Sequence, residues 1–258
     1  MKAVSNSHTV VSAGEPPAPT ARTTTGLSGL DAVLEGGFPA GRSVLVCGAP
    51  GTGKTTLAVQ FLAAGMAEGT PGVLVTVDQK PRHVIDDAAR FGWPLAEAVN
   101  GGALLLLDPA PYFTAGRDPA KRLEARQLTA ELARRTRELG AGRLVIDSLG
   151  SLLPHGLPCD DIREFLRTLV FAVEDNLRCT TLFTWSDRGR GRGRPEADPR
   201  QAEMETLASG VLDLKLRRRA DGRYERRLFV RKMRGTATEL TERPYAIRPG
   251  LGLVLVSG

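Results

Sequence analysis

The segment GAPGTGKT, residues 48–55, constrains the fold of this chain more than any other. It matches the pattern G-x-x-x-x-G-K-[ST], in which a glycine-rich loop wraps a phosphate group with its backbone N–H groups. The loop needs a strand before it and a helix after it, because the helix N-terminus adds a positive dipole end. RSVLVCG (42–48) is typical of a buried strand, and KTTLAVQFLAAGMAEG (54–69) has helical spacing with a glycine stop. The segment therefore predicts a nucleotide-binding loop between a strand and a helix.

Two side chains of this loop have predicted chemical roles. Lys54 should reach the β- and γ-phosphates, and the Thr55 hydroxyl should be a ligand of Mg²⁺. The alternative is a glycine-rich turn that binds no ligand. The predicted nucleotide-binding residues are Gly48, Ala49, Pro50, Gly51, Thr52, Gly53, Lys54, Thr55 and Thr56.

Apolar runs alternate with helical segments along most of the chain. Further strands are predicted at 72–78, 103–108, 143–147 and 179–185, and further helices at 82–92, 120–140 and 160–176. This alternation requires crossover connections, so we predict an α/β fold with a mostly parallel central sheet and helices on both faces. After about residue 209 the pattern changes. GVLDLKL and YERRLFVRKM, joined by a turn at 220–222, predict a β-hairpin, and YAIRPGLGLVLV predicts a second one.

Two aspartates end predicted strands at the edge of the sheet where ligands bind. Asp147 ends RLVID and is the predicted second anchor of Mg²⁺, although an aspartate there can also cap the next turn. Asp78 ends GVLVTVD and has two interpretations. It either holds the attacking water as a general base or caps the helix that begins near Pro81.

Composition restricts the class of protein. No stretch approaches about 18 uncharged apolar residues, so we expect no membrane-spanning helix. Residues 1–20 lack the apolar core of a secretory signal and predict a disordered tail before a single domain at 21–258. Cys47, Cys159 and Cys179 are widely spaced, which suits neither a disulfide framework nor a zinc site. We therefore expect a cytoplasmic protein.

The net charge of +6 is concentrated late in the chain, where residues 188–234 hold 15 Lys and Arg against 7 Asp and Glu. This is an anion-binding face or the result of an arginine-rich coding bias. Within it, the run DRGRGRGRP begins directly after the fifth predicted strand. Its arginines could follow the phosphates of a single-stranded nucleic acid, although the run contains no aromatic residue to stack on a base. A flexible solvated loop and a contact with a protein partner are the alternatives. The arginines of this run are Arg188, Arg190, Arg192 and Arg194.

Four segments in a fixed order resemble the KaiC-like branch of the RecA-superfamily ATPases. They are TGLSGLDAVLEGGFPAGRSVLVCGAPGTGKTTLAVQF, LVTVDQKPRHVIDDAARFGW, LVIDS and KMRGT. The resemblance covers the chain from about residue 23 to its end. It implies a RecA-type core, ATP with Mg²⁺ as the ligand, and usually a ring of six subunits with a nucleotide at each interface.

The resemblance also gives a role to two cations near the C-terminus. Lys232 and Arg234 lie two residues apart in an apolar-rich run, so in a β-strand they project from one face. In rings of this family the matching residues reach the γ-phosphate held by the neighbouring subunit. The alternative is a pair of ordinary surface cations.

The match has departures from the family pattern. Where the family typically carries two adjacent glutamates, this chain has Asp78 and Gln79, a shorter carboxylate followed by an amide. Thr206 falls roughly where the clock protein of this family is phosphorylated, but threonine is common before an apolar strand, and we do not predict autophosphorylation.

We predict a slowly hydrolysing ATPase whose homo-oligomeric ring serves signalling or scaffolding with an unidentified protein partner. One alternative is a nucleic-acid-dependent ATPase of recombinase or recombination-mediator type, which the arginine run favours. The other is a nucleotide-sensing pseudo-ATPase, which the Asp78-Gln79 pair favours.

Overall fold

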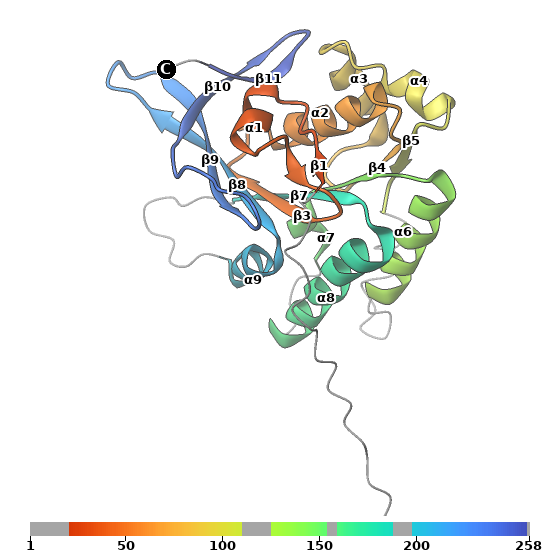
Figure 1. Cartoon of the computed structure of the whole chain (residues 1–258). Helices are drawn as coiled ribbons and strands as arrows, with labels where there is room; N and C mark the ends of the chain where they lie inside the picture. Colours follow the sequence, from red (N-terminus) through yellow and green to blue (C-terminus); the bar gives the residue numbers. More distant parts are fainter. Residues whose placement is uncertain (1–20, 110–124, 154–158, 188–197, 257–258) are drawn as a thin grey trace, which may run out of the picture.

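A nine-stranded sheet forms the centre of the computed structural model, which describes residues 21–109, 125–153, 159–187 and 198–256 (Figure 1). The strand order is β11-β10-β9-β8-β3-β7-β6-β4-β5. From β8 to β5 all neighbours pair in parallel, whereas β9, β10 and β11 add antiparallel strands on the other side of β8. The predicted α/β fold with C-terminal hairpins is confirmed.

The strands are β1 (Arg22–Thr23), β2 (Phe38–Pro39), β3 (Ser43–Gly48), β4 (Gly72–Thr76), β5 (Leu104–Leu107), β6 (Arg143–Asp147), β7 (Thr180–Ser186), β8 (Gly210–Arg218), β9 (Tyr224–Met233), β10 (Arg243–Arg248) and β11 (Gly252–Leu255). The helices are α1 (Ser28–Val33), α2 (Lys54–Ala67), α3 (Pro81–Ala89), α4 (Leu95–Asn100), α6 (Ala125–Leu139), α7 (Leu149–Leu152), α8 (Cys159–Phe171), the π-helical turn η3 (Ala172–Leu177) and α9 (Pro199–Leu207). Strands β1 and β2 form a separate two-stranded ladder. None of the described helices combines the length and the apolar character needed to cross a bilayer.

The central parallel strands β3, β4, β6 and β7 are buried on both faces. Successive side chains of a strand point to opposite sides, so each strand contributes to the apolar clusters on both faces. On β3, Val44 and Val46 join one apolar cluster, while Leu45 and Cys47 join the other. Residues of α1, α2, α3 and α4 complete the first cluster, and residues of α6, α7, α8 and α9 complete the second. This two-sided burial explains why the parallel strands read as continuous apolar runs.

Several predicted elements end earlier than expected, and two of these differences matter for the site. The strand predicted at 72–78 ends at Thr76, so Asp78 lies in the loop that leads to α3. The helix predicted at 160–176 is α-helical only to Phe171 and continues as η3. From this wider turn the Glu174 carboxylate accepts hydrogen bonds from the backbone N–H of Ser43, at 2.9 Å, and from its hydroxyl. The predicted tail at 1–20 lies outside the described residues.

One buried arginine ties the N-terminal segment to the sheet. Arg143, at the start of β6, is 1% exposed and donates to the carbonyls of Thr24 at 2.9 Å and Phe61 at 2.6 Å. Its guanidinium also pairs with Glu68 at 2.6 Å. Burial lowers the pKa of Arg143, and the charge of Glu68 opposes this change. Gly65 leaves the space for the side chain, since a Cβ there would lie 2.4 Å from it.

We expect Arg143→Met to lower the free energy of unfolding by about 2–4 kcal/mol, because two backbone carbonyls lose their donor inside the protein. Urea denaturation followed by circular dichroism measures the change. Arg135→Met is the matched control, because its ion pair with Glu131 on α6 is exposed and should contribute less than about 1 kcal/mol. Equal losses in the free energy of unfolding would show that the buried contacts of Arg143 stabilise the protein no more than an exposed ion pair does.

Candidate nucleotide-binding site

The predicted phosphate-binding loop runs from the end of β3 to the start of α2, the position that the sequence predicted. Gly51 and Gly53 have φ of 81° and 94°, in the left-handed region that favours glycine. Gly48 is required for a different reason. A Cβ at this position would lie 2.4 Å from the Leu214 carbonyl oxygen of β8. The loop therefore has a backbone conformation in which residues other than glycine would cause strain or steric overlap. Its N–H groups continue directly into the N-terminus of α2.

The side chain of Lys54 is enclosed by the loop. The residue is 7% exposed, and its ammonium donates to the Ala49 carbonyl across the loop at 3.1 Å. Burial lowers the pKa of Lys54, while the charges of Asp147 and Asp187 oppose this change. An ammonium has three donors, so one internal hydrogen bond leaves capacity for a phosphate oxygen.

The two predicted magnesium ligands are in direct contact. The Thr55 hydroxyl, in the first turn of α2, donates to Asp147 Oδ2 at 2.7 Å, although the two residues are 92 positions apart. Asp147 ends β6 and is 8% exposed. The Thr184 hydroxyl of β7 donates to its other carboxylate oxygen. A hydroxyl and a carboxylate held together beside a phosphate-binding loop are the oxygen ligands that Mg²⁺ prefers, so the residues present fit this ion.

Asp78 faces the same edge of the sheet from the loop after β4. Its Oδ2 accepts a hydrogen bond from the Ser151 hydroxyl at 3.0 Å, and Ser151 in turn contacts the Ser148 hydroxyl at 3.2 Å. Helix α3 begins at Pro81 after the N-cap residue Lys80, and no side chain caps it. The interpretation of Asp78 as a helix cap is therefore wrong, and the general-base interpretation stays a prediction.

Gln79 lines a cavity of about 130 Å³ beside the loop, together with Thr55 and Thr56. The amide therefore lies next to the first turn of α2, where the family typically carries a second glutamate. The remaining walls come from Val59, Val84, Asp87, Ala88, Phe91 and Trp93.

Arg226 is a site residue that the sequence analysis missed. It lies near the start of β9, and its Nε and Nη2 both lie 3.4 Å from the Gly51 carbonyl of the loop. On the neighbouring strand β10, the Tyr245 hydroxyl donates to the Thr52 carbonyl. The sequence offers no local signal for Arg226, because it is one of several arginines in the hairpin and only the strand register brings it to the loop.

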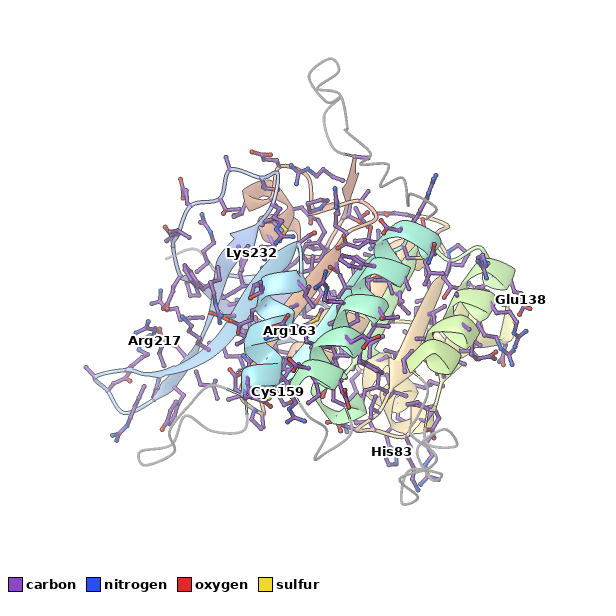
Figure 2. The ribbon with its side chains drawn as sticks, turned by 90° about the horizontal axis from the view of Figure 1, so that it is seen from below. His83, Glu138, Cys159, Arg163, Arg217 and Lys232 are labelled. Atoms are coloured by element: carbon purple, nitrogen blue, oxygen red, sulfur yellow. The ribbon has the colours of Figure 1, made fainter. Side chains whose placement is uncertain are left out.

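Lys232 and Arg234 lie toward the amino ends of the parallel strands, whereas the loop lies at their carboxyl ends. The two cations therefore do not reach the loop of their own chain. Lys232 is in register with Val211 of β8, which pairs with Leu45 of β3, three residues before the end of that strand. Three residues span roughly 10 Å along a strand. In Figure 2, Lys232 and Arg217 mark the two ends of the β8–β9 hairpin.

Both cations point at the C-terminus of α9. The Lys232 ammonium donates to the carbonyls of Glu205 and Thr206 at 3.0 Å and Ala208 at 2.7 Å. Arg234 donates to the Thr206 carbonyl at 3.0 Å and to that of Leu207 at 3.4 Å. The prediction that the two side chains project together is therefore met. Their reach to a neighbouring subunit stays a prediction.

Other predictions depend on residues that the structure does not describe or does not test. The arginines of the run at 188–194 lie outside the described residues, so the nucleic-acid interpretation stays a sequence prediction. Thr206 is exposed, and its hydroxyl donates to the Ala202 carbonyl within α9. Among the described residues, no group of three His, Cys, Asp or Glu side chains could hold a further metal ion.

Comparison with known proteins agrees with this geometry. The family described as "ATPase: KaiC" matches residues 23–257. A UPF0273 protein of Methanopyrus kandleri is 33% identical over 240 residues, covering 88% of each chain. The circadian clock oscillator protein KaiC of Synechococcus elongatus is 34% identical over 229 residues, which are 88% of this chain and 43% of KaiC. The crystal structure of a KaiC-like protein from Pyrococcus horikoshii superposes with a TM-score of 0.77 at 30% identity, covering 93% of this chain and 100% of that one.

We expect Gly48→Ala to destabilise the protein by about 2–3 kcal/mol, because its Cβ would collide with the backbone of β8 and push β3 and β8 apart. Gly69→Ala is the control, since φ at Gly69 is 74° and nothing lies within 4 Å of a Cβ there. It should cost only about 1–2 kcal/mol of backbone strain. Thermal unfolding measures both, and a Gly48→Ala protein as stable as the parent would contradict the close approach of the two strands.

Proposed function

The chain belongs to the KaiC family of ATPases, and on that premise we propose that it binds Mg²⁺-ATP in the loop at 48–55 and hydrolyses it slowly within a ring of identical subunits. The contact between Thr55 and Asp147 carries the proposal. It brings a hydroxyl and a carboxylate from distant parts of the chain to the point where a bound triphosphate needs a cation.

Residues of the loop, of helix α2 and of strands β6, β7 and β9 would bind the triphosphate and neutralise its charge. The loop N–H groups and Lys54 hold the phosphates, and Thr55 and Asp147 would hold the Mg²⁺. The ion, when bound, would supply positive charge that neutralises the triphosphate. Arg226 adds a further cation, because its guanidinium already lies against the loop at Gly51. Thr184 fixes one oxygen of Asp147 and so orients the carboxylate.

Asp78 is the residue best placed to orient the attacking water. It lies at the same edge of the sheet as Asp147, and Ser151 fixes one of its oxygens while the other can accept a proton. The carboxylate is one methylene shorter than the glutamate typical of the family, so its reach toward the γ-phosphate is short. Slow turnover is the expected consequence.

A nucleotide sensor without turnover would use the same binding residues, and the Asp78-Gln79 pair favours this second candidate. A binding measurement therefore does not distinguish the ATPase from the sensor, whereas a measurement of ATP turnover does.

We expect turnover below about 1 s⁻¹, the low end of typical enzymes, and its loss in Asp78→Asn with ATP affinity nearly unchanged. Phosphate release measures the first quantity and calorimetric titration with Mg²⁺-ATP the second. Asp86→Asn, an exposed carboxylate on α3, is the control and should behave like the parent. Parental turnover in Asp78→Asn would remove Asp78 from the mechanism, and tight binding without any turnover in the parent would favour the sensor.

The separation of the loop from the cation pair supports the proposed ring. Lys232 and Arg234 lie at the edge of the sheet opposite their own loop, so they can meet a γ-phosphate only if another subunit presents it. A head-to-tail contact of this kind closes into a ring when the rotation fits. Six chains of 27.6 kDa would total about 166 kDa, which light scattering can measure.

Complementation between two inactive variants tests this arrangement. Lys54→Ala keeps the cations but loses the phosphate cradle, and Lys232→Ala/Arg234→Ala keeps the cradle but loses the cations. Each alone should lose most activity, on the order of 10³-fold for the cation pair. Mixed rings should recover part of it, because some interfaces join an intact cradle to intact cations. Mixed rings that form and stay inactive would show that the pair does not act between subunits.

A further inference from the structure

A β-bulge in β9 brings neighbouring cations to the side of the sheet that α9 covers. Lys232 pairs with Val211 of β8 and Val230 pairs with Leu212, so Arg231 is an extra residue without a partner in the ladder. Side chains alternate in a regular strand, and a bulge re-aims them. Here both Arg231 and Lys232 contact the same residue of α9, Glu205.

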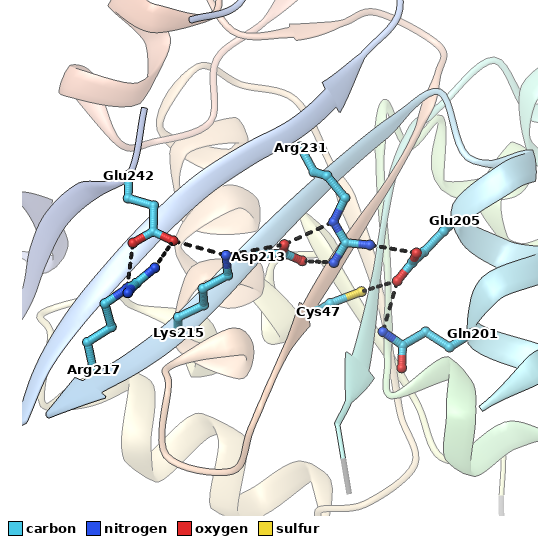
Figure 3. A network of polar contacts seen from close by, with 8 residues as sticks. All are labelled: Cys47, Gln201, Glu205, Asp213, Lys215, Arg217, Arg231 and Glu242. Atoms are coloured by element: carbon cyan, nitrogen blue, oxygen red, sulfur yellow. Dashed lines mark hydrogen bonds and ion pairs between the residues drawn. The ribbon is translucent and has the colours of Figure 1, made fainter. Parts of the chain in front are cut away.

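The Arg231 guanidinium is held on two sides by carboxylates (Figure 3). Its Nε donates to Asp213 Oδ2 at 2.9 Å, its Nη2 donates to the other oxygen of Asp213, and its Nη1 pairs with Glu205 Oε2 at 2.5 Å. Asp213 is 6% exposed, so this fork-shaped contact is anchored in the sheet. Gln201 donates to the second oxygen of Glu205 at 3.0 Å, which fixes that carboxylate on α9.

Glu205 is therefore bound twice by consecutive residues of β9. Arg231 binds its carboxylate, and Lys232 binds its backbone carbonyl at 3.0 Å. The last carbonyls of a helix carry partial negative charge, which stabilises the ammonium of Lys232 and the guanidinium of Arg234 beside them. The position of the C-terminus of α9 therefore sets where both cations lie.

The chain beyond Arg234 is held from the other side. Arg22 donates to the Gly235 carbonyl at 3.0 Å and to the Thr236 hydroxyl at 2.6 Å, and the Ala237 N–H donates to Glu35 at 3.4 Å. The cation pair thus stands between two anchored regions: α9 on one side, and Arg22 of β1 with Glu35 after α1 on the other.

We propose that Glu205 and Arg231 are positioning residues for hydrolysis in the neighbouring subunit: their ion pair locks α9 to the bulge and so holds Lys232 and Arg234 at the C-terminus of α9. There the ammonium of Lys232 exchanges one of its three carbonyl partners for a γ-phosphate oxygen of the neighbour. The inference rests on the proposed function, because it needs the cation pair to act between subunits. Neither positioning residue touches the nucleotide. They act through the carbonyls that hold the pair.

The same network also lies close to the loop of its own subunit, which provides the competing route. Cys47, directly before Gly48, places its Sγ 3.9 Å from Glu205 Oε1. Burial, with Glu205 beside it, raises the pKa of the Cys47 thiol, so it remains neutral and is a weak donor. The contacts of Glu205 with Arg231 and Lys232 are charge-assisted and outweigh its one weak contact with Cys47. Which subunit's site responds to a change at Glu205 can be measured.

Glu205→Gln removes the charge from the lock and keeps the size of the side chain. Glu203→Gln is its matched control. Glu203 lies on the same helix, its side chain is 23% exposed against 25% for Glu205, and it pairs with one arginine, Arg163 of α8, at 3.1 Å. We expect both variants to lose similar thermal stability. Only Glu205→Gln should lower kcat, by about tenfold, and the KM for ATP should stay unchanged. A tenfold loss is what the removal of one charge-assisted hydrogen bond would cause.

Mixed rings show on which side of the interface Glu205 acts. The Lys54→Ala chain supplies the cations, and the Lys232→Ala/Arg234→Ala chain supplies the cradle. Adding Glu205→Gln to the chain that supplies the cations should lower the recovered activity about tenfold, and adding Glu203→Gln there should leave it within about twofold. Adding Glu205→Gln to the chain that supplies the cradle should leave the recovered activity unchanged.

Two results would overturn the inference while the proposed function stands. One is equal activity of the Glu205→Gln and Glu203→Gln rings. The other is a loss that appears when Glu205→Gln is on the chain that supplies the cradle, which would assign the network to its own loop through Cys47. Mixed rings that are inactive without either glutamate substitution would instead overturn the action between subunits, and the inference with it.

Discussion

The hydrogen bond between Thr55 and Asp147 depends on a sheet whose central strands all run in one direction. Strands β3, β7, β6 and β4 are parallel neighbours, so the loop after β3, the carboxylate at the end of β6 and the segment after β4 meet at one edge. Thr184 of β7 then fixes the carboxylate from between these strands. Reversing one strand would send its terminal side chains to the other edge. The parallel register is thus the condition for the whole candidate site.

The cations of the antiparallel β8–β9 hairpin lie at both ends of the parallel strands, some near their carboxyl ends and others near their amino ends. The start of β9 returns to the loop edge and brings Arg226 to Gly51, while its end reaches the far edge and brings Lys232 and Arg234 to α9. In the function that we propose, one strand therefore serves the nucleotide of its own subunit at one end and that of a neighbour at the other. The bulge at Arg231 adds an anchor between these two functions, because it links β9 to α9 just where the second group of cations begins.

The sequence predicted most elements of the site and few of the contacts that hold them. The pattern G-x-x-x-x-G-K-[ST] located the loop, and the strand-terminal position of Asp147 located the partner of Thr55, because both signals are local in the chain. Arg226 was missed, since nothing within β9 distinguishes it from Arg227 beside it. The short helix α9 was missed because its nine residues show little apolar periodicity, although Asp198 and Pro199 form a local helix start. Of the two interpretations of Asp78, the helix cap failed because Lys80, and not Asp78, stands at the start of α3.

The sequence by itself determined the type of fold and the chemistry of the loop. Alternating apolar runs permit only a covered parallel sheet, and glycines with a lysine and a threonine at fixed spacing specify a phosphate cradle. Only the tertiary structure decided which distant residues meet that cradle and which do not. Pairing between strands far apart in sequence placed Thr184 and Arg226 at the site, and a single extra residue in β9 turned Arg231 toward Glu205. Such pairings depend on register, which each strand acquires only from its neighbour in the folded sheet.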